Sequence, residues 1–292
     1  MQQRALVLGG GGVTGVAWEI GMLAGLAEHG IDLAEADLVV GTSAGSVVGV
    51  DVRSGVGIAE IYAQQLAPPG EEPYARMGLR QIAGLLWCMT LTRDPVKART
   101  RIGRLALAAK TEPEEQRRRV IAGRLPVHEW PARRLVVTAV DAGTGTLTTF
   151  DAASGVSLVD AVGASCAVPG VWPPVTIGGR RYVDGGMRST ANVDLAAGYE
   201  QVVVIAPLPR GVGHITGVAR QVGALPGSPA VAVIVPGKAA LKAIGRNVLD
   251  PASRQPAARA GHAQAAAEAE RIAAVWRAGR PAAGEPDPAV GG

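Results

Sequence analysis

Residues Gly41–Gly45 read Gly-Thr-Ser-Ala-Gly, which matches the G-x-S-x-G pattern of a nucleophile elbow. In such an elbow the serine lies on a sharp turn between a strand and a helix, and the flanking glycines leave room beside its hydroxyl. The context fits, because a short apolar run at 37–40 precedes the motif and small residues typical of a helix follow at 44–52. The pattern therefore predicts that Ser43 is a nucleophile for acyl transfer, with an ordinary structural turn as the alternative.

A second glycine-rich turn, Gly9–Gly15, also lies between an expected strand and an expected helix. Unpaired backbone N–H groups at the start of a helix attract negative charge. If the two strands are parallel neighbours, this turn reaches the same sheet edge as Ser43. We therefore expect the N–H groups of Gly10, Gly11 and Gly12 to stabilise the oxyanion that forms when the serine attacks an ester.

Gly10, Gly12 and Gly15 also satisfy G-x-G-x-x-G, the fingerprint of a dinucleotide site. That interpretation requires an acidic residue at the end of the second strand, where this chain has Gly41 and Ser43. No Gly-Lys-Ser/Thr sequence follows the glycines, which excludes a phosphate-binding P-loop. A Rossmann-like nucleotide-binding oxidoreductase is therefore the weaker alternative.

A serine nucleophile needs a general base. Asp184 is a candidate, because it follows the apolar end of an expected strand and precedes Gly185 and Gly186. An aspartate has an ordinary pKa of about 3.9, yet it can act as a base when it is desolvated and hydrogen-bonded to the serine. An Asp-Gly-Gly turn without chemistry is the alternative. The four histidines have no catalytic signature and are interpreted as surface or capping residues: His29, His128, His214 and His262.

Three segments stand in the order and context of the motifs of patatin-like phospholipases, a family that this chain resembles: Leu8–Gly15, Gly41–Gly45 and Asp184–Gly186. The runs Ala164–Pro169 and Trp172–Pro174 add to the likeness, which covers about Arg4 to Pro207.

The resemblance implies an α/β fold of three layers, with a mainly parallel central sheet flanked by helices. It implies Ser43 as the nucleophile, Asp184 as its base and Gly10–Gly12 as the oxyanion hole, without metal or cofactor. The implied substrates are acyl esters of phospholipids and related lipids, cleaved through an acyl-serine intermediate. Thr14 stands where many bacterial members have arginine, which weakens the case for a phospholipid in particular. Five further glycines shape the motifs: Gly15, Gly41, Gly45, Gly185 and Gly186.

Alternating strand and helix patterns predict an α/β class independently of the resemblance. Helices are expected at 13–29, 44–52, 158–167 and 257–276, strands at 5–8, 37–40, 134–140, 146–150, 202–206 and 231–235, and a hairpin at 175–183. Residues 55–125 are less regular. We expect a catalytic region over 4–207, a C-terminal part of the same domain over 208–276, and a flexible tail over 277–292.

A lipid hydrolase needs an apolar approach to its serine. Four residues share one face of an expected helix, with Trp87 nearby: Ile82, Leu85, Leu86 and Met89. This face is interpreted as ordinary core packing, with a lid or an interfacial helix as the alternative. Arg117–Arg119 is interpreted as a solvated helical face.

The overall composition favours a soluble, folded protein. The chain of 292 residues is 48% hydrophobic, with a net charge of +4 and a pI near 9.4. This mild charge is compatible with transient contact with an anionic membrane, whereas the lack of a basic, aromatic-rich stripe argues against nucleic acid. Cys88 and Cys166 have neither metal-ligand nor disulfide-framework spacing. Without a transmembrane or signal-peptide pattern, we expect a cytoplasmic protein, at most peripheral at the membrane.

Some alternatives stay open at this stage. Nothing in the sequence separates a phospholipase from a general esterase or thioesterase. A catalytically silent lipid-binding or regulatory protein of the same fold is the main competing hypothesis, against which the intact Ser43 and Asp184 argue. Headgroup, acyl-chain length and oligomeric state are not predicted.

Overall fold

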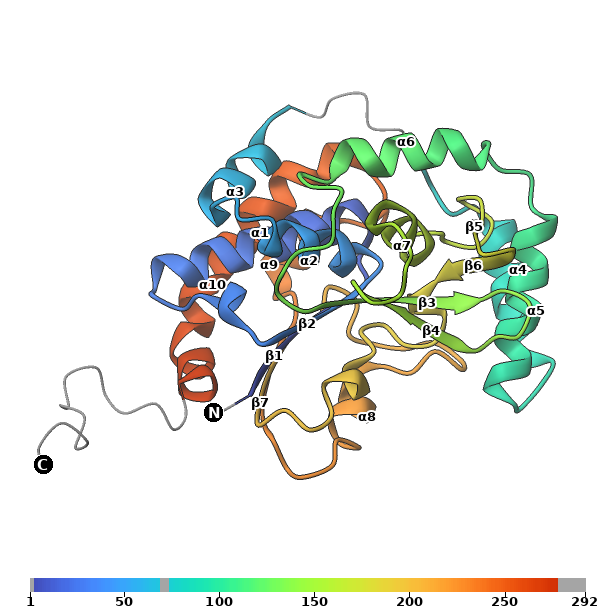
Figure 1. Ribbon diagram of the computed structural model, residues 1–292. Helices are drawn as coiled ribbons and strands as arrows, with labels where there is room; N and C mark the ends of the chain where they lie inside the picture. Colours follow the sequence, from blue (N-terminus) through green and yellow to red (C-terminus); the bar gives the residue numbers. More distant parts are fainter. Residues whose placement is uncertain (1–2, 69–73, 278–292) are drawn as a thin grey trace, which may run out of the picture.

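The computed structural model describes residues 3–68 and 74–277. Within these ranges one mixed sheet runs through the molecule, with helices on both faces (Figure 1). Its strands are β1 (Arg4–Leu8), β2 (Leu38–Thr42), β3 (Leu135–Asp141), β4 (Leu147–Phe150), β5 (Val175–Ile177), β6 (Arg180–Asp184), β7 (Gln201–Ile205) and β8 (Ala230–Ile234).

The sheet is parallel at its centre. The hydrogen-bonded path runs β5-β6-β3-β2-β1-β7-β8, and β4 pairs with β3 off this path. The pairs β1–β2, β1–β7, β2–β3 and β7–β8 are parallel, whereas the pairs that involve β4, β5 or β6 are antiparallel. Strands β2, β3 and β7 are buried along their whole length, which is why they occur in the sequence as continuous apolar runs rather than alternating ones.

The helices of the described residues are α1 (Gly12–Glu28), α2 (Ala44–Arg53), α3 (Ile58–Leu66), α4 (Leu79–Thr90), α5 (Pro95–Ala108), α6 (Glu114–Arg124), α7 (Leu158–Ser165), α8 (Val218–Val222), α9 (Lys238–Ile244) and α10 (Arg254–Trp276). Side-chain caps fix the starts of two of them. Asp94 accepts the N–H groups of Val96 and Lys97 at the start of α5, and Ser157 accepts that of Asp160 at the start of α7.

Alternate residues of the strands point to opposite faces of the sheet and pack into two separate cores. Leu6 and Leu8 face the larger core, which α1, α2, α3, α7 and α10 cover, whereas Ala5 and Val7 face a thinner layer that contains α8 (Figure 1). Helices α4 and α5 pack together beside β3 and β6. The sheet is therefore enclosed between two helical layers of unequal depth.

The register along β3 brings two strand ends together. β4 occupies one edge of β3 from Val137 to Val140, so β2 and β6 share the other edge. Thr42 at the end of β2 pairs with Thr138, and Asp184 at the end of β6 pairs with the next residue, Ala139. Because β2 and β6 run in opposite directions, their carboxyl ends meet head to head. This register places Asp184 next to the residue that follows Thr42.

Most of the expected elements are confirmed. The α/β class and every expected strand and helix are present, with boundaries within three residues of the predicted ones. The irregular stretch 55–125 also contains α3, α5 and α6, which were not predicted; of these, α6 has a sequence without a clear apolar face. Apart from Arg277, the predicted tail over 277–292 lies outside the described residues.

The prediction of core packing is only half correct for α4. Leu85 and Met89 are buried, but Ile82 and Leu86 are 40% and 44% exposed and Trp87 is 65% exposed. The physical reason is position, since α4 packs on α5 and not on the faces of the sheet that the two larger cores cover. No helix among the described residues combines the length and apolarity that a bilayer crossing needs.

Candidate active site

Ser43 joins β2 to α2 in a strained turn. Its φ of 52° and ψ of −117° lie in a region that residues other than glycine rarely adopt. Glycines make the turn possible, since a Cβ on Gly41 would lie 2.5 Å from the Cα of Ser46 and one on Gly45 would collide with β1. The N–H of Gly45 donates to the carbonyl of Gly9 at 2.9 Å. The elbow is thereby tied to the glycine-rich turn that precedes α1.

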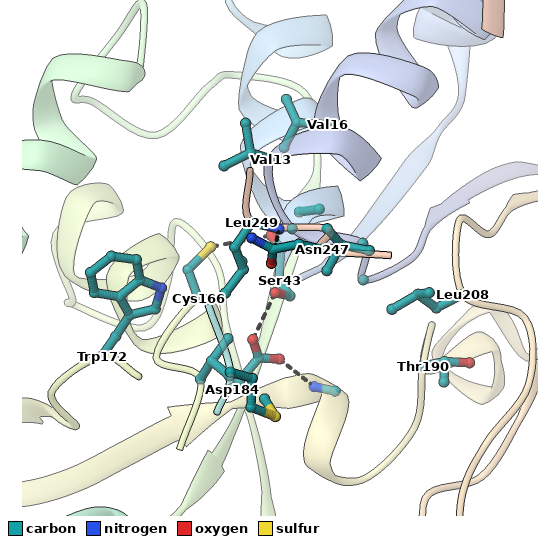
Figure 2. Close-up of a pocket in the computed structure, with 18 of the residues that line it drawn as sticks. Val13, Val16, Ser43, Cys166, Trp172, Asp184, Thr190, Leu208, Asn247 and Leu249 are labelled. Carbon is teal, nitrogen blue, oxygen red and sulfur yellow. Dashed lines mark hydrogen bonds between the residues drawn. The ribbon is translucent and has the colours of Figure 1, made fainter. Parts of the chain in front are cut away.

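The structure brings Ser43 and Asp184 together. The Ser43 hydroxyl donates to Oδ2 of Asp184 at 2.7 Å, and Oδ1 accepts the N–H of Gly186 at 2.7 Å (Figure 2). Both side chains are buried. Burial raises the pKa of Asp184 to about 6, while the hydrogen bonds from Ser43 and Gly186 oppose the rise. A carboxylate with this pKa is ionised near neutral pH but is a stronger base than a free aspartate.

Side chains from α2 and the α7 region hold the backbone of the serine. The N–H of Ser43 donates to the hydroxyl of Ser165 at 2.9 Å. Its carbonyl accepts the Ser46 hydroxyl at 2.6 Å and the Cys166 thiol at 3.4 Å. Burial raises the pKa of Cys166 to about 11, so the thiol keeps its proton and can donate. Ser165 and Cys166 lie in the run Ala164–Pro169 that adds to the family likeness, but a supporting role was predicted for none of the three residues.

Asn192 cross-links the strands beneath the dyad. This buried residue has a φ of 53°, and its Nδ2 donates to the hydroxyls of Thr42 at 3.0 Å and Thr138 at 3.3 Å. The two hydroxyls lie 2.9 Å apart. β2, β3 and the segment after β6 are thus joined at one point. No local pattern could reveal this role, because Asn192 and Thr42 are 150 residues apart.

The glycine-rich turn lies beside the serine. A Cβ on Gly10 would lie 3.6 Å from Cβ of Ser43, which shows how closely the backbone passes the nucleophile. The Gly10 N–H donates to the Thr190 carbonyl at 2.8 Å, so this predicted oxyanion donor is already engaged. The N–H groups of Gly11 and Gly12 have no acceptor within the described part of the chain. These two donors are therefore the ones open to a substrate oxygen.

Glu19 supports this turn from inside the protein. The side chain is fully buried on α1, and its Oε1 accepts the N–H of Gly9 at 3.0 Å. Burial raises the pKa of Glu19 well above its ordinary value, with the Gly9 hydrogen bond opposing the rise. Burial therefore disfavours the charged form of this carboxyl group, and its Oε1 holds the backbone of the glycine-rich turn.

A cavity of about 720 Å³ opens onto Ser43 and Asp184. Figure 2 shows the serine hydroxyl turned toward Asp184, with Trp172 on one side of the pair and Leu208 on the other. Most of the wall is apolar, and it is built by α1, by the loop before β5 and by the segments after β7 and α9. A largely apolar cleft with a few convergent polar groups is typical of a site for a small molecule or a lipid chain.

The four histidines lie elsewhere. None lines the cavity. His128 and His214 contact the carbonyls of Ala122 and Thr92, and His262 pairs with Glu28. Within residues 3–68 and 74–277, no three His, Cys, Asp or Glu side chains form a group that could hold a metal ion. Asp184 is thus the group that contacts the serine hydroxyl.

Comparison with known families decides the assignment. A family model described as patatin-like phospholipase matches residues 6–197, which include the elbow, the glycine-rich turn and Asp184. The chain belongs to the patatin-like phospholipase family. It is an enzyme of the patatin-like phospholipase/esterase class, and patatin-like lipases act on lipid esters. No curated protein sequence matches it.

Two solved structures resemble this patatin-like phospholipase at low sequence identity. VipD from Legionella pneumophila is 14% identical with a TM-score of 0.48, over 93% of this chain and 67% of that one. The type III effector protein ExoU is 16% identical with a TM-score of 0.42, over 93% of this chain and 53% of that one. The chain therefore spans about half to two-thirds of the length of these proteins.

Thr14 has a definite place in this patatin-like phospholipase. It is fully buried, and its N–H and hydroxyl both approach the carbonyl of Val248, at 3.1 and 3.3 Å. Where many bacterial members have arginine, this chain thus fastens the segment after α9 over the glycine-rich turn. No charge from position 14 can reach a substrate, so any positive charge in the cavity must come from other elements.

Proposed function

We propose that the protein is a serine lipid acyl hydrolase in which Ser43 is the nucleophile and Asp184 its general base. The observation that carries the proposal is the 2.7 Å hydrogen bond between the two side chains at the wall of a largely apolar cavity. The strained elbow supports it, because positive φ at a non-glycine residue is typical of a constrained functional position.

The chemistry follows from these positions. The Ser43 oxygen attacks the ester carbonyl carbon while its proton passes to Asp184. The carbonyl oxygen becomes an oxyanion, which the N–H groups of Gly11 and Gly12 stabilise; one such donor typically contributes about 10²–10³ in turnover. Collapse of the intermediate expels the alcohol, which takes the proton from Asp184, and leaves an acyl-serine. Water then attacks this ester while Asp184 takes a proton from it; the bond from the acyl carbon to the Ser43 oxygen breaks, Asp184 returns the proton to that oxygen, and the carboxylic acid leaves.

The same proposal places the mouth of the cavity against a membrane surface. Tyr74 and Ile82 line the cavity and are exposed, and Leu79 and Trp87 extend the apolar surface along α4 with exposed fractions of 86% and 65%. Large exposed apolar patches mark interaction sites, and a helix with such a face can rest in the headgroup region. A lipid could then pass from the bilayer to Ser43 without crossing water.

An activity-based label tests the dyad. Wild type, Ser43→Ala and Asp184→Asn are treated with a fluorophosphonate probe and assayed with p-nitrophenyl esters of graded chain length. We expect labelling and turnover in the wild type, loss of both in Ser43→Ala, and a decrease of at least about 10³ in turnover in Asp184→Asn. A folded wild type that neither labels nor turns over any ester would refute the proposal and favour a silent lipid-binding protein.

A further inference from the structure

The cavity around Ser43 has an uneven charge. Among its described lining residues the acidic side chain is Asp184, which is already bonded to the serine hydroxyl. Five arginines line the same cavity: Arg76, Arg117, Arg124, Arg210 and Arg246. In a narrow cleft with apolar walls such an imbalance is focused rather than screened. The described lining residues of the cavity therefore favour an anion, and among them no carboxylate is left to pair with a cation.

Three of these arginines are available to a ligand. Arg76, Arg210 and Arg246 are exposed and have no hydrogen bond or ion pair with any described residue. Other arginines of the chain are engaged, as Arg188 is with both carboxylate oxygens of Asp194 at 2.9 and 2.7 Å. A free guanidinium presents a planar set of donors that matches the oxygens of a phosphate group.

Positive charge also reaches the inner wall. The guanidinium carbon of Arg117 lies 3.7 Å from the ring centre of Trp172, and the Arg117 side chain is buried. The charges of Arg117 and Arg124 oppose the burial that raises the pKa of the Cys166 thiol. This thiol donates to the Ser43 carbonyl, so the charges of both arginines act on a group that contacts the backbone of the nucleophile.

We infer that the cavity selects acyl esters whose headgroup is a phosphate with net negative charge, bound by Arg210 and Arg246. Zwitterionic and uncharged lipids with the same acyl chains are poorer substrates, because an ammonium group finds no unpaired acidic partner among the described lining residues and an uncharged group gains nothing from the arginines. This selectivity rests on the proposed ester hydrolysis, and it adds a headgroup subsite formed by residues outside the three family motifs.

Matched substrates test the selectivity. Phosphatidylglycerol and phosphatidylcholine with identical acyl chains are presented in mixed micelles of a nonionic detergent, with p-nitrophenyl butyrate as a neutral reference. We expect kcat/KM for phosphatidylglycerol to exceed that for phosphatidylcholine by about tenfold. Arg210→Gln and Arg246→Gln should each lower this ratio by about two- to fivefold, with the butyrate rate of the same variant as its reference. Arg220→Gln, an exposed residue of α8 that does not line the cavity, is the matched control and should change neither.

Binding separates the remaining outcomes. Calorimetry with Ser43→Ala compares octyl phosphate, octyl glucoside and inorganic phosphate, at constant ionic strength and below the micelle concentration. We expect octyl phosphate to bind at least tenfold tighter than octyl glucoside, and to bind more weakly when Arg246→Gln is added to Ser43→Ala.

Two results overturn the inference and leave the proposed function intact. One is equal kcat/KM for the two phospholipids while the butyrate is still hydrolysed, and the other is equal binding of the two octyl compounds. Failure to hydrolyse any ester refutes the proposed function. In that case the binding of octyl phosphate relative to octyl glucoside still tests whether the phosphate subsite exists. Inorganic phosphate that binds as tightly as octyl phosphate identifies a free-phosphate site and overturns the lipid assignment.

Discussion

At the scale of single residues, the proton acceptor sets the working pH of the site. Asp184 must be ionised to take the proton of Ser43, and burial raises the pKa of this carboxyl group to about 6. We therefore expect kcat/KM for a neutral p-nitrophenyl ester to rise with pH, with an apparent pKa near 6, and to level off above neutral pH. Initial rates from pH 4.5 to 8.5 in buffers of constant ionic strength measure this profile.

A neighbouring acid supplies the control. Asp51 lies on α2, is buried and has a pKa raised by burial to about 7, yet it does not line the cavity. Asp51→Asn should leave the acid limb of the profile, the rise of kcat/KM with an apparent pKa near 6, at the same pH. The reason is that the rate depends on the titration of Asp184. Movement of the limb in Asp51→Asn, or a rate independent of pH down to 4.5, would contradict the assignment of Asp184 as the base.

At the scale of elements, the glycine-rich turn and the start of α1 determine where the oxyanion donors point. Gly12 has a φ of 61°, and a Cβ there would lie 2.5 Å from the Val248 carbonyl oxygen. We expect Gly12→Ala to lower kcat by about 10² or more, because the N–H groups of Gly11 and Gly12 would move. The same substitution should lower the free energy of unfolding by about 1–3 kcal/mol.

Esterase kinetics and urea denaturation measure both effects of this substitution. Gly57→Ala is the matched control, because Gly57 precedes α3 with a negative φ and a Cβ there would meet open space. Its kcat should be unchanged. If Gly12→Ala retained full activity, the donors of this turn would have no part in the reaction.

The exposed face of α4 makes a separate prediction about membranes. A double variant, Leu79→Ser with Trp87→Ser, should weaken binding to phospholipid vesicles by about tenfold or more, because fully burying one such side chain contributes about 1.5–3 kcal/mol. Hydrolysis of soluble p-nitrophenyl butyrate should stay at the wild-type level. Vesicle sedimentation and the soluble assay measure the two effects. Leu241→Ser, at a residue of α9 that is 54% exposed, is the control, and an equal loss in this variant would remove α4 from the proposal.

The elements also show what the sequence could predict. Strands β2 and β7 are buried on both faces, so they are continuous apolar runs that can be recognised without a partner. Helix α6 has few apolar residues, and they do not recur at the spacing of a helical face, so the sequence does not predict it. Its position is set by packing on α7. Asn192 is essential to the geometry under the dyad, but its contacts with Thr42 and Thr138 are long-range and leave no local signature.

At the scale of the whole molecule, the fold buries acidic groups on different elements. Asp184, Glu19 and Asp51 are all buried, and burial raises the pKa of each above its ordinary value. Three acids that resist ionisation in the folded state couple stability to pH. Burial of these acids therefore has a cost in stability above about pH 4 that the apolar core must offset.

The sign of this coupling follows from proton binding. Below about pH 4 the three acids are protonated in both states, and above it the unfolded chain releases protons that the folded chain retains. The free energy of unfolding should therefore fall as pH rises from about 4 to 7. This window lies between the pKa of an acid in the unfolded chain and the folded pKa of Asp51, which is about 7.

Asp51→Asn should flatten this fall, by about 2 kcal/mol between pH 5 and 8. Asp184→Asn should flatten only the part below pH 6, because the folded pKa of Asp184 is about 6. Urea denaturation of the three proteins at pH 5, 6, 7 and 8 measures the slopes, and parallel curves for wild type and Asp51→Asn would show that this carboxyl group is not desolvated in the folded protein.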